Sequence, residues 1–134
     1  MYSNNSIVIA AAPGLVEDIE VGYLPAPNDN IYFIVVAIRF NESITINYSF
    51  EGNSVDIAVR EQQESMIDVE IGDWVAKGDK IGRFLRPVEY DHIHFGVYRN
   101  DIAICPRLVM GEDDYNGIMS LVHSFHPTWE LCYP

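Results

Sequence analysis

The chain contains, in its second half, the run Val69-Glu70-Ile71-Gly72-Asp73-Trp74-Val75-Ala76-Lys77-Gly78-Asp79-Lys80-Ile81-Gly82. Apolar and polar residues alternate along the run, and glycine stands at Gly72, Gly78 and Gly82. This pattern is typical of short twisted strands joined by tight turns, because glycine adopts positive φ without a Cβ clash. The run therefore predicts β structure.

A second motif follows shortly afterwards: Tyr90-Asp91-His92-Ile93-His94-Phe95-Gly96-Val97. On a strand, residues at i and i+2 point to the same face, so we expect His92 and His94 to share one face. Two imidazoles on one face can share a metal ion, or one can bind the metal while the other moves a proton. The pair is thus a candidate metal or catalytic site.

Together the two motifs resemble the lysostaphin-type (LytM-like) zinc metallopeptidases, which carry V-x-x-G-D-x-V-x-x-G-x-x-I-G followed by H-x-H-F. A looser similarity covers Ala10–Val16, and another reaches Pro106, so that the resemblance spans about residues 7–110. The glycine run is also found in lipoyl- and biotin-carrier domains and in a sugar-phosphotransferase domain; the H-x-H-F motif makes the resemblance more specific. It implies an all-β fold, a twisted antiparallel sheet with a barrel-sandwich-hybrid-like core.

The chain of 134 residues is expected to form a single domain, with the family-like core followed by a helix and tail over residues 111–134. Asn116–Phe125 is the predicted helix, because its apolar residues fall on one helical stripe. Ser54–Arg60 alternates and is predicted as a strand, and Arg60–Ser65 as a polar loop. The prediction is therefore an all-β domain with one short C-terminal helix.

The charge of the chain limits its partners. The formal net charge of −12 argues against nucleic acid and anionic membrane surfaces, and it would steer cationic peptides or basic proteins toward the domain. No apolar run approaches the length that crosses a bilayer. Met1–Asn5 has no basic region, so no signal peptide is expected, although the resembling family usually works outside the cytoplasm. The compartment and the oligomeric state stay open.

The chain has two cysteines, Cys105 and Cys132. In an oxidising compartment they can form one disulfide that ties the C-terminal tail to the β domain. In a reducing compartment they would be two free thiols. The sequence leaves both alternatives open.

The resemblance implies a zinc ion held by three protein ligands, two of them from an upstream H-x-x-x-D segment. His94 would be the third ligand, and His92 the catalytic histidine that stabilises the intermediate or moves a proton. Residues 1–6 contain neither histidine nor aspartate, and Phe50 stands where the family has a further active-site histidine. The family pattern therefore predicts a degenerate site and no resident cofactor.

The first functional hypothesis is a catalytically degenerate, peptidase-like domain that binds a peptide, a cell-wall fragment or a partner protein in the old cleft. The second is an active zinc metalloendopeptidase in which His123 and His126 join His94 as replacement metal ligands. Glu89 and Asp91 are candidates for carboxylates that support the histidines. A third hypothesis is a structural or oligomerising β-domain without a ligand.

Overall fold

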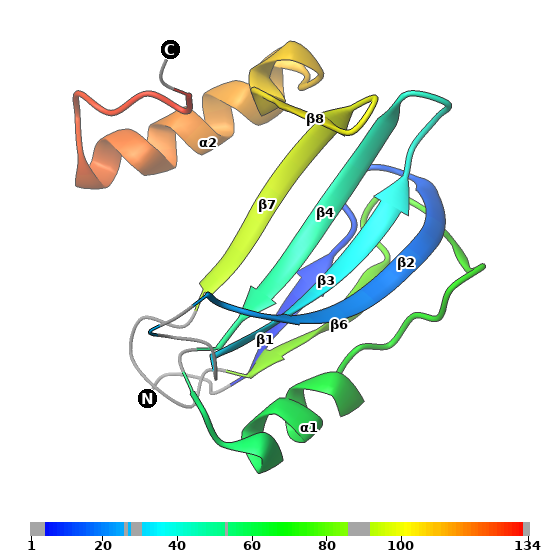
Figure 1. Cartoon of the computed structure of the whole chain (residues 1–134). Helices are drawn as coiled ribbons and strands as arrows, with labels where there is room; N and C mark the ends of the chain where they lie inside the picture. Colours follow the sequence, from blue (N-terminus) through cyan, green and yellow to red (C-terminus); the bar gives the residue numbers. More distant parts are fainter. Residues whose placement is uncertain (1–4, 26, 28–30, 53, 86–91, 133–134) are drawn as a thin grey trace.

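The computed structural model describes residues 5–25, 27, 31–52, 54–85 and 92–132, which form two antiparallel sheets (Figure 1). The larger sheet has the strand order β5-β2-β3-β4-β7-β8, and the smaller one pairs β1 with β6. The strands are β1 Asn5–Ile9, β2 Gly14–Tyr23, β3 Tyr32–Arg39, β4 Ile44–Glu51, β5 Trp74–Val75, β6 Lys80–Leu85, β7 His92–Arg99 and β8 Ile102–Ile104. The predicted all-β fold class is confirmed.

The C-terminal helix is confirmed as α2, Glu112–Phe125, which follows the short 3-10 helix η1, Pro106–Leu108. It begins earlier than the apolar stripe predicts, because its first turn is Glu112, Asp113 and Asp114. Negative side chains are stabilised at this end by the positive end of the helix dipole. An acidic segment that looks like a loop in the sequence is therefore the start of the helix.

A second helix, α1 (Ile57–Ser65), lies where the sequence predicts a strand and a polar loop, and that prediction is wrong. Asp56 caps the helix by accepting a hydrogen bond from the Ala58 amide at 2.9 Å. On the helix, the fully buried Gln63 donates to the Arg83 carbonyl and accepts from the Leu85 amide, both at 2.8 Å. The cap and these contacts with β6 outweigh the alternating pattern.

Two turns of the glycine run repeat the same hydrogen bonds. In the first, the Asp73 amide donates to the Glu70 carbonyl at 3.1 Å, and the Asp73 carboxylate accepts from the Glu70 amide at 2.9 Å. In the second, Asp79 and Ala76 make the same pair of bonds at 3.1 and 2.8 Å. The glycine before each aspartate has positive φ, 99° and 89°. The predicted tight turns are thus confirmed at Gly72 and Gly78, with the aspartates as their side-chain acceptors, whereas Gly82 lies within β6.

The same turns hold the segment between β1 and β2 against the core. Gly78 and Asp79 each bond to the backbone of Ala10 at 2.8 Å, and the preceding turn makes an equivalent pair of 2.8 Å bonds with Val16. Ala10 and Val16 are almost fully buried. The glycine run therefore fixes both ends of the Ala10–Val16 segment, which is how it organises the fold.

The hydrophobic core lies between the two sheets. Alternate side chains of β3 and β4 are buried against β1 and β6, and these core residues are Tyr32, Ile34, Val36, Ile38, Ile44, Ile46, Tyr48 and Phe50. The intervening residues of β4, which include Ser49 and Glu51, consequently point to the outer face of the larger sheet. This outer face carries the candidate site.

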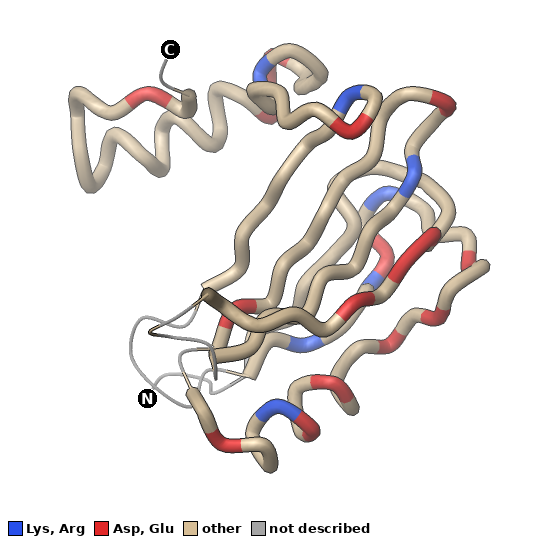
Figure 2. Tube along the Cα trace, viewed as in Figure 1, with Lys and Arg blue, Asp and Glu red and all other residues tan. Residues whose placement is uncertain are grey.

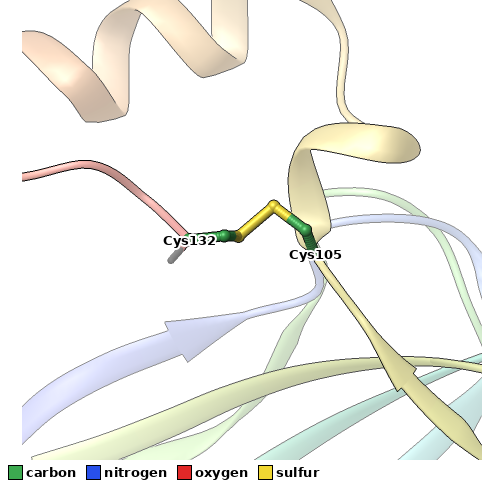
Figure 3. Close-up of a disulfide and its surroundings, with 2 residues drawn as sticks. All are labelled: Cys105 and Cys132. Carbon is green, nitrogen blue, oxygen red and sulfur yellow. A yellow bond between two sulfur atoms is a disulfide. The ribbon is translucent and has the colours of Figure 1, made fainter. Parts of the chain in front are cut away.

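Of the two alternatives for the cysteines, the structure has the disulfide: Cys105 and Cys132 are bonded, with an S–S distance of 2.02 Å (Figure 3). The bond ties the tail after α2 to the segment after β8. Figure 1 shows α2 beside β8, at the end of the larger sheet where β7 ends. Among the described helices, none is long and apolar enough to cross a membrane.

Candidate functional site

The two predicted histidines lie beside a glutamate that was not among the predicted site residues. In the register of β4 with β7, Glu51 is the cross-strand partner of His92, and Ser49 is the partner of His94. Because side chains alternate along each strand, these four lie together on the outer face of the larger sheet. His92 and His94 therefore share one face, as expected, and Glu51 stands beside them.

The polar atoms of this trio converge. The Nε2 atoms of His92 and His94 are 3.1 Å apart, and His92 Nε2 is 3.2 Å from Glu51 Oε2. The other carboxylate oxygen, Oε1, lies 2.8 Å from His94 Nδ1 and accepts a 3.3 Å hydrogen bond from the Ser49 hydroxyl. Within the described part of the chain, Glu51, His92 and His94 form the group whose ligand atoms all lie within 4.8 Å of one another.

Each contact has a definite role in orienting the donors. A neutral His94 that donates from Nδ1 to Glu51 carries its lone pair on Nε2, which is the atom that faces His92. A carboxylate that accepts from the remote nitrogen of a ligating histidine fixes the tautomer and the ring orientation. Glu51 thus orients His94 through Oε1, while its other oxygen, Oε2, faces Nε2 of His92.

This donor set fits a zinc ion. Zinc binds histidine nitrogen and carboxylate oxygen at about 2.0–2.2 Å, so two ligands of a tetrahedral ion lie about 3.3 Å apart. The observed separations of 3.1 and 3.2 Å come close to that value. The side chains of His92 and His94 are 51% and 66% exposed, whereas that of Glu51 is 21% exposed. The site is therefore open to solvent on one side, with its carboxylate held at the base.

The structure does not bring His123 and His126 to this site. His123 Nε2 lies 3.0 Å from the Trp129 carbonyl oxygen, and the His126 ring stacks on the Trp129 ring with centroids 3.7 Å apart. Both histidines belong to the C-terminal end of α2 and the tail, at the end of the helix that lies away from β8 (Figure 1). They organise the tail around Trp129. Glu89 and Asp91 lie outside the described residues.

Phe50, the residue at the position of the expected further histidine, is fully buried in the core. It points away from the trio, because it alternates with Ser49 and Glu51 along β4. The strand alternation was the available signal for Glu51, since a residue next to Phe50 must point to the opposite face. In the sequence, however, Glu51 directly precedes Gly52, a residue type that is typical of turns.

A cavity of about 580 Å³ is separate from the trio. It is lined by Phe95 and Val97, whose side chains alternate with His94 and so point to the opposite face of β7. Its other wall includes Ile118 of α2. The domain thus has two distinct surfaces around β7, a polar one with the histidines and an apolar one facing α2.

Comparisons of the chain with protein-family models, with curated proteins and with solved structures found no match.

Proposed function

We propose that this chain is a peptidase-like domain that holds a zinc ion through Glu51, His92 and His94 and uses it to bind a peptide, a cell-wall fragment or a partner protein. The observation that supports the proposal is that Nε2 of His92 lies 3.1 Å from Nε2 of His94 and 3.2 Å from Oε2 of Glu51, in a group whose ligand atoms all lie within 4.8 Å of one another. When bound, zinc supplies a Lewis acid with an open position for an oxygen ligand.

Binding is favoured over turnover by the way the two histidines are used. The resemblance implies one histidine as a ligand and the other as a proton carrier. Here both Nε2 atoms face the same point, so both serve as ligands and neither is left to move a proton. Glu51 is engaged through both oxygens. The residues of the site therefore orient and hold a ligand but leave no group to move a proton. This is the arrangement that we expect of a degenerate peptidase.

A second candidate function, zinc-dependent peptide hydrolysis, is favoured by the ligand types. Two histidines and one glutamate form the zinc ligand set of several metallopeptidases. In this version Glu51 and His92 take the places of the two missing upstream ligands. The replacements therefore come from β4 and β7, and not from the C-terminal His123 and His126.

The test is the metal content of the purified protein after exposure to zinc and removal of loosely bound metal. We expect about one equivalent of zinc, lost in His94→Ala and in Glu51→Ala. His123→Ala is the matched control. It removes a histidine that is also exposed but that contacts Trp129 and not the zinc position. Wild-type zinc content in His94→Ala would contradict the proposal. Release of cleaved peptide by the zinc-loaded protein would favour hydrolysis.

A further inference from the structure

The apolar cavity between β7 and α2 has the composition of a binding groove. We call it the α2 groove and define it by six of its lining residues, Ile9, Ala12, Phe95, Val97, Val109 and Ile118. A volume of about 580 Å³ falls in the range of sites that take a ligand or several apolar side chains. Ile9, Phe95, Val109 and Ile118 are between 38% and 53% exposed. Contiguous exposed apolar surface of this kind marks an interaction site.

One wall of the groove is a strand edge that is only partly paired by the described strands. β8 pairs with β7 only over Val97–Arg99. The Asn100 amide donates to the Ser43 carbonyl next to β4, so even-numbered residues of β7 direct their backbone groups toward β4. Ile93 and Phe95 therefore direct theirs to the other side. There, no strand of the described chain pairs with them.

A free edge beside an apolar groove accepts an extended peptide. The backbone of such a peptide continues the sheet, and its alternate side chains enter the groove on the side of Phe95. The remaining side chains face the opposite side, toward solvent. The occupant is thus specified by a period-two pattern, with apolar residues at every second position.

The charge of the domain indicates which residues should occupy the remaining positions of the peptide, those that do not enter the groove. The chain has 20 acidic residues against 8 lysines and arginines. Figure 2 shows β7 free of charged residues until its end, while acidic residues stand around it, including the first turn of α2. Lys77, the one basic residue that lines the cavity in the described chain, is paired with Asp114 at 3.4 Å. With Lys77 and Asp114 paired to each other, an apolar groove within an acidic surface complements a segment whose other positions are basic.

We propose that the α2 groove binds an extended segment of a partner protein in which apolar residues alternate with lysine or arginine. This segment adds a strand to the free edge of β7. A second copy of this chain is disfavoured because each copy carries the same net charge of −12. The groove lies on the face of β7 opposite the histidines, whereas the lysine or arginine side chains of the segment would lie on the histidine face.

The experiment uses the whole protein in the presence of a chelator, which separates this proposal from metal binding. The probe is a capped peptide of about six residues in which valine alternates with lysine. Its two controls replace lysine by glutamate, or methylate the backbone nitrogens that would pair with β7. We expect saturable binding of the lysine peptide that weakens with salt, and at least about tenfold weaker binding of either control.

Two variants on one helix locate the site. Ile118→Lys places a charge in the groove, and we expect it to weaken binding of the lysine peptide by at least about tenfold. Leu121→Lys is the matched control, because Leu121 is 64% exposed on α2 but does not line the cavity. It should bind as the wild type does, and circular dichroism should show the same helix content in both variants.

Three results would overturn the proposal. The first is equal binding of the lysine and glutamate peptides, or of the methylated peptide. The second is wild-type binding by Ile118→Lys, or no binding of the lysine peptide by the wild type. The third is a dimer in sedimentation that Ile118→Lys dissociates, because the occupant would then be a second copy of the chain.

Discussion

His92 Nε2 lies 3.2 Å from Oε2 of Glu51, its cross-strand partner between β4 and β7. A polar cross-strand pair on an open sheet face contributes at most about 1 kcal/mol to stability. Here the carboxylate also binds His94 Nδ1 at 2.8 Å, so one side chain sets the position of two imidazoles. We therefore expect substitutions in this group to change ligand binding much more than folding.

Glu51→Gln tests that expectation. The amide has the same shape as the carboxylate but has no charge, and it presents only one acceptor oxygen. Removing a carboxylate that merely supports a zinc ligand costs 10- to 100-fold in affinity, so loss of a ligand should cost at least about 100-fold. Zinc titration against a competing chelator measures this change. The unfolding midpoint in urea should stay close to that of the wild type.

Ser49→Ala is the matched control for the glutamate. Ser49 donates to Glu51 Oε1 at 3.3 Å and holds the carboxylate without facing the zinc position. We expect its zinc affinity to fall by less than that of Glu51→Gln. Equal losses in the two variants would mean that Glu51 acts only by orienting His94.

The same substitution at two glycines should shift stability in opposite directions. Gly78 has φ of +89° in a tight turn, a conformation that costs an alanine about 1–2 kcal/mol. Gly117 lies inside α2, and a Cβ there meets nothing within 4 Å. Gly78→Ala should therefore destabilise the protein, and Gly117→Ala should stabilise the helix by up to about 1 kcal/mol. Urea unfolding of both variants measures the difference, and destabilisation by Gly117→Ala would contradict the account.

The turn at Gly78 shows why much of this fold could be predicted from the sequence. Glycine followed by aspartate encodes the turn locally, through positive φ and a side-chain acceptor. Alternation along β4 encodes which of its side chains face the core. Both signals depend only on neighbouring residues, so they remain readable without the structure.

The features that could not be predicted depend on distant contacts. Residues 57–65 are helical because Gln63 bonds to β6, a partner that is remote in the sequence. Glu51 joins the site because the register of β4 with β7 places it opposite His92. The H-x-H motif predicts a shared face for two histidines, but it carries no information about which residue of the neighbouring strand completes the group.

Reduction of the Cys105–Cys132 disulfide should destabilise the C-terminal part of the chain. The bond closes a loop with a sequence separation of 27, and a loop of this size constrains the unfolded chain by about 3–4 kcal/mol in the chain-entropy account. We expect a reductant to lower the urea midpoint of the wild type. The double variant Cys105→Ser with Cys132→Ser should start at the lower midpoint and be insensitive to reductant. A wild type that is equally insensitive would contradict this prediction.

Tyr48 links the core to the pH dependence of stability. Burial raises the pKa of its hydroxyl above the usual value of 10.0, while the hydrogen bond from the Ala11 amide, at 2.8 Å, acts in the opposite direction. Above pH 10.0 the unfolded chain loses this proton and the folded chain keeps it. The contribution to the unfolding free energy is thus complete below pH 10.0 and is lost as the pH rises toward the folded pKa, by up to about 1.4 kcal/mol per pH unit.

Tyr48→Phe separates this effect from the other titrating groups, which the two proteins share. At neutral pH the variant should be less stable by about 1 kcal/mol, because the Ala11 amide loses its acceptor. Above pH 10.0 the wild type loses stability through the tyrosine and the variant does not, so the difference should shrink. Urea unfolding of both proteins at neutral pH and at several values above pH 10.0 measures it. A difference that stays constant over this range would mean that the hydroxyl of Tyr48 titrates alike in the folded and unfolded chains.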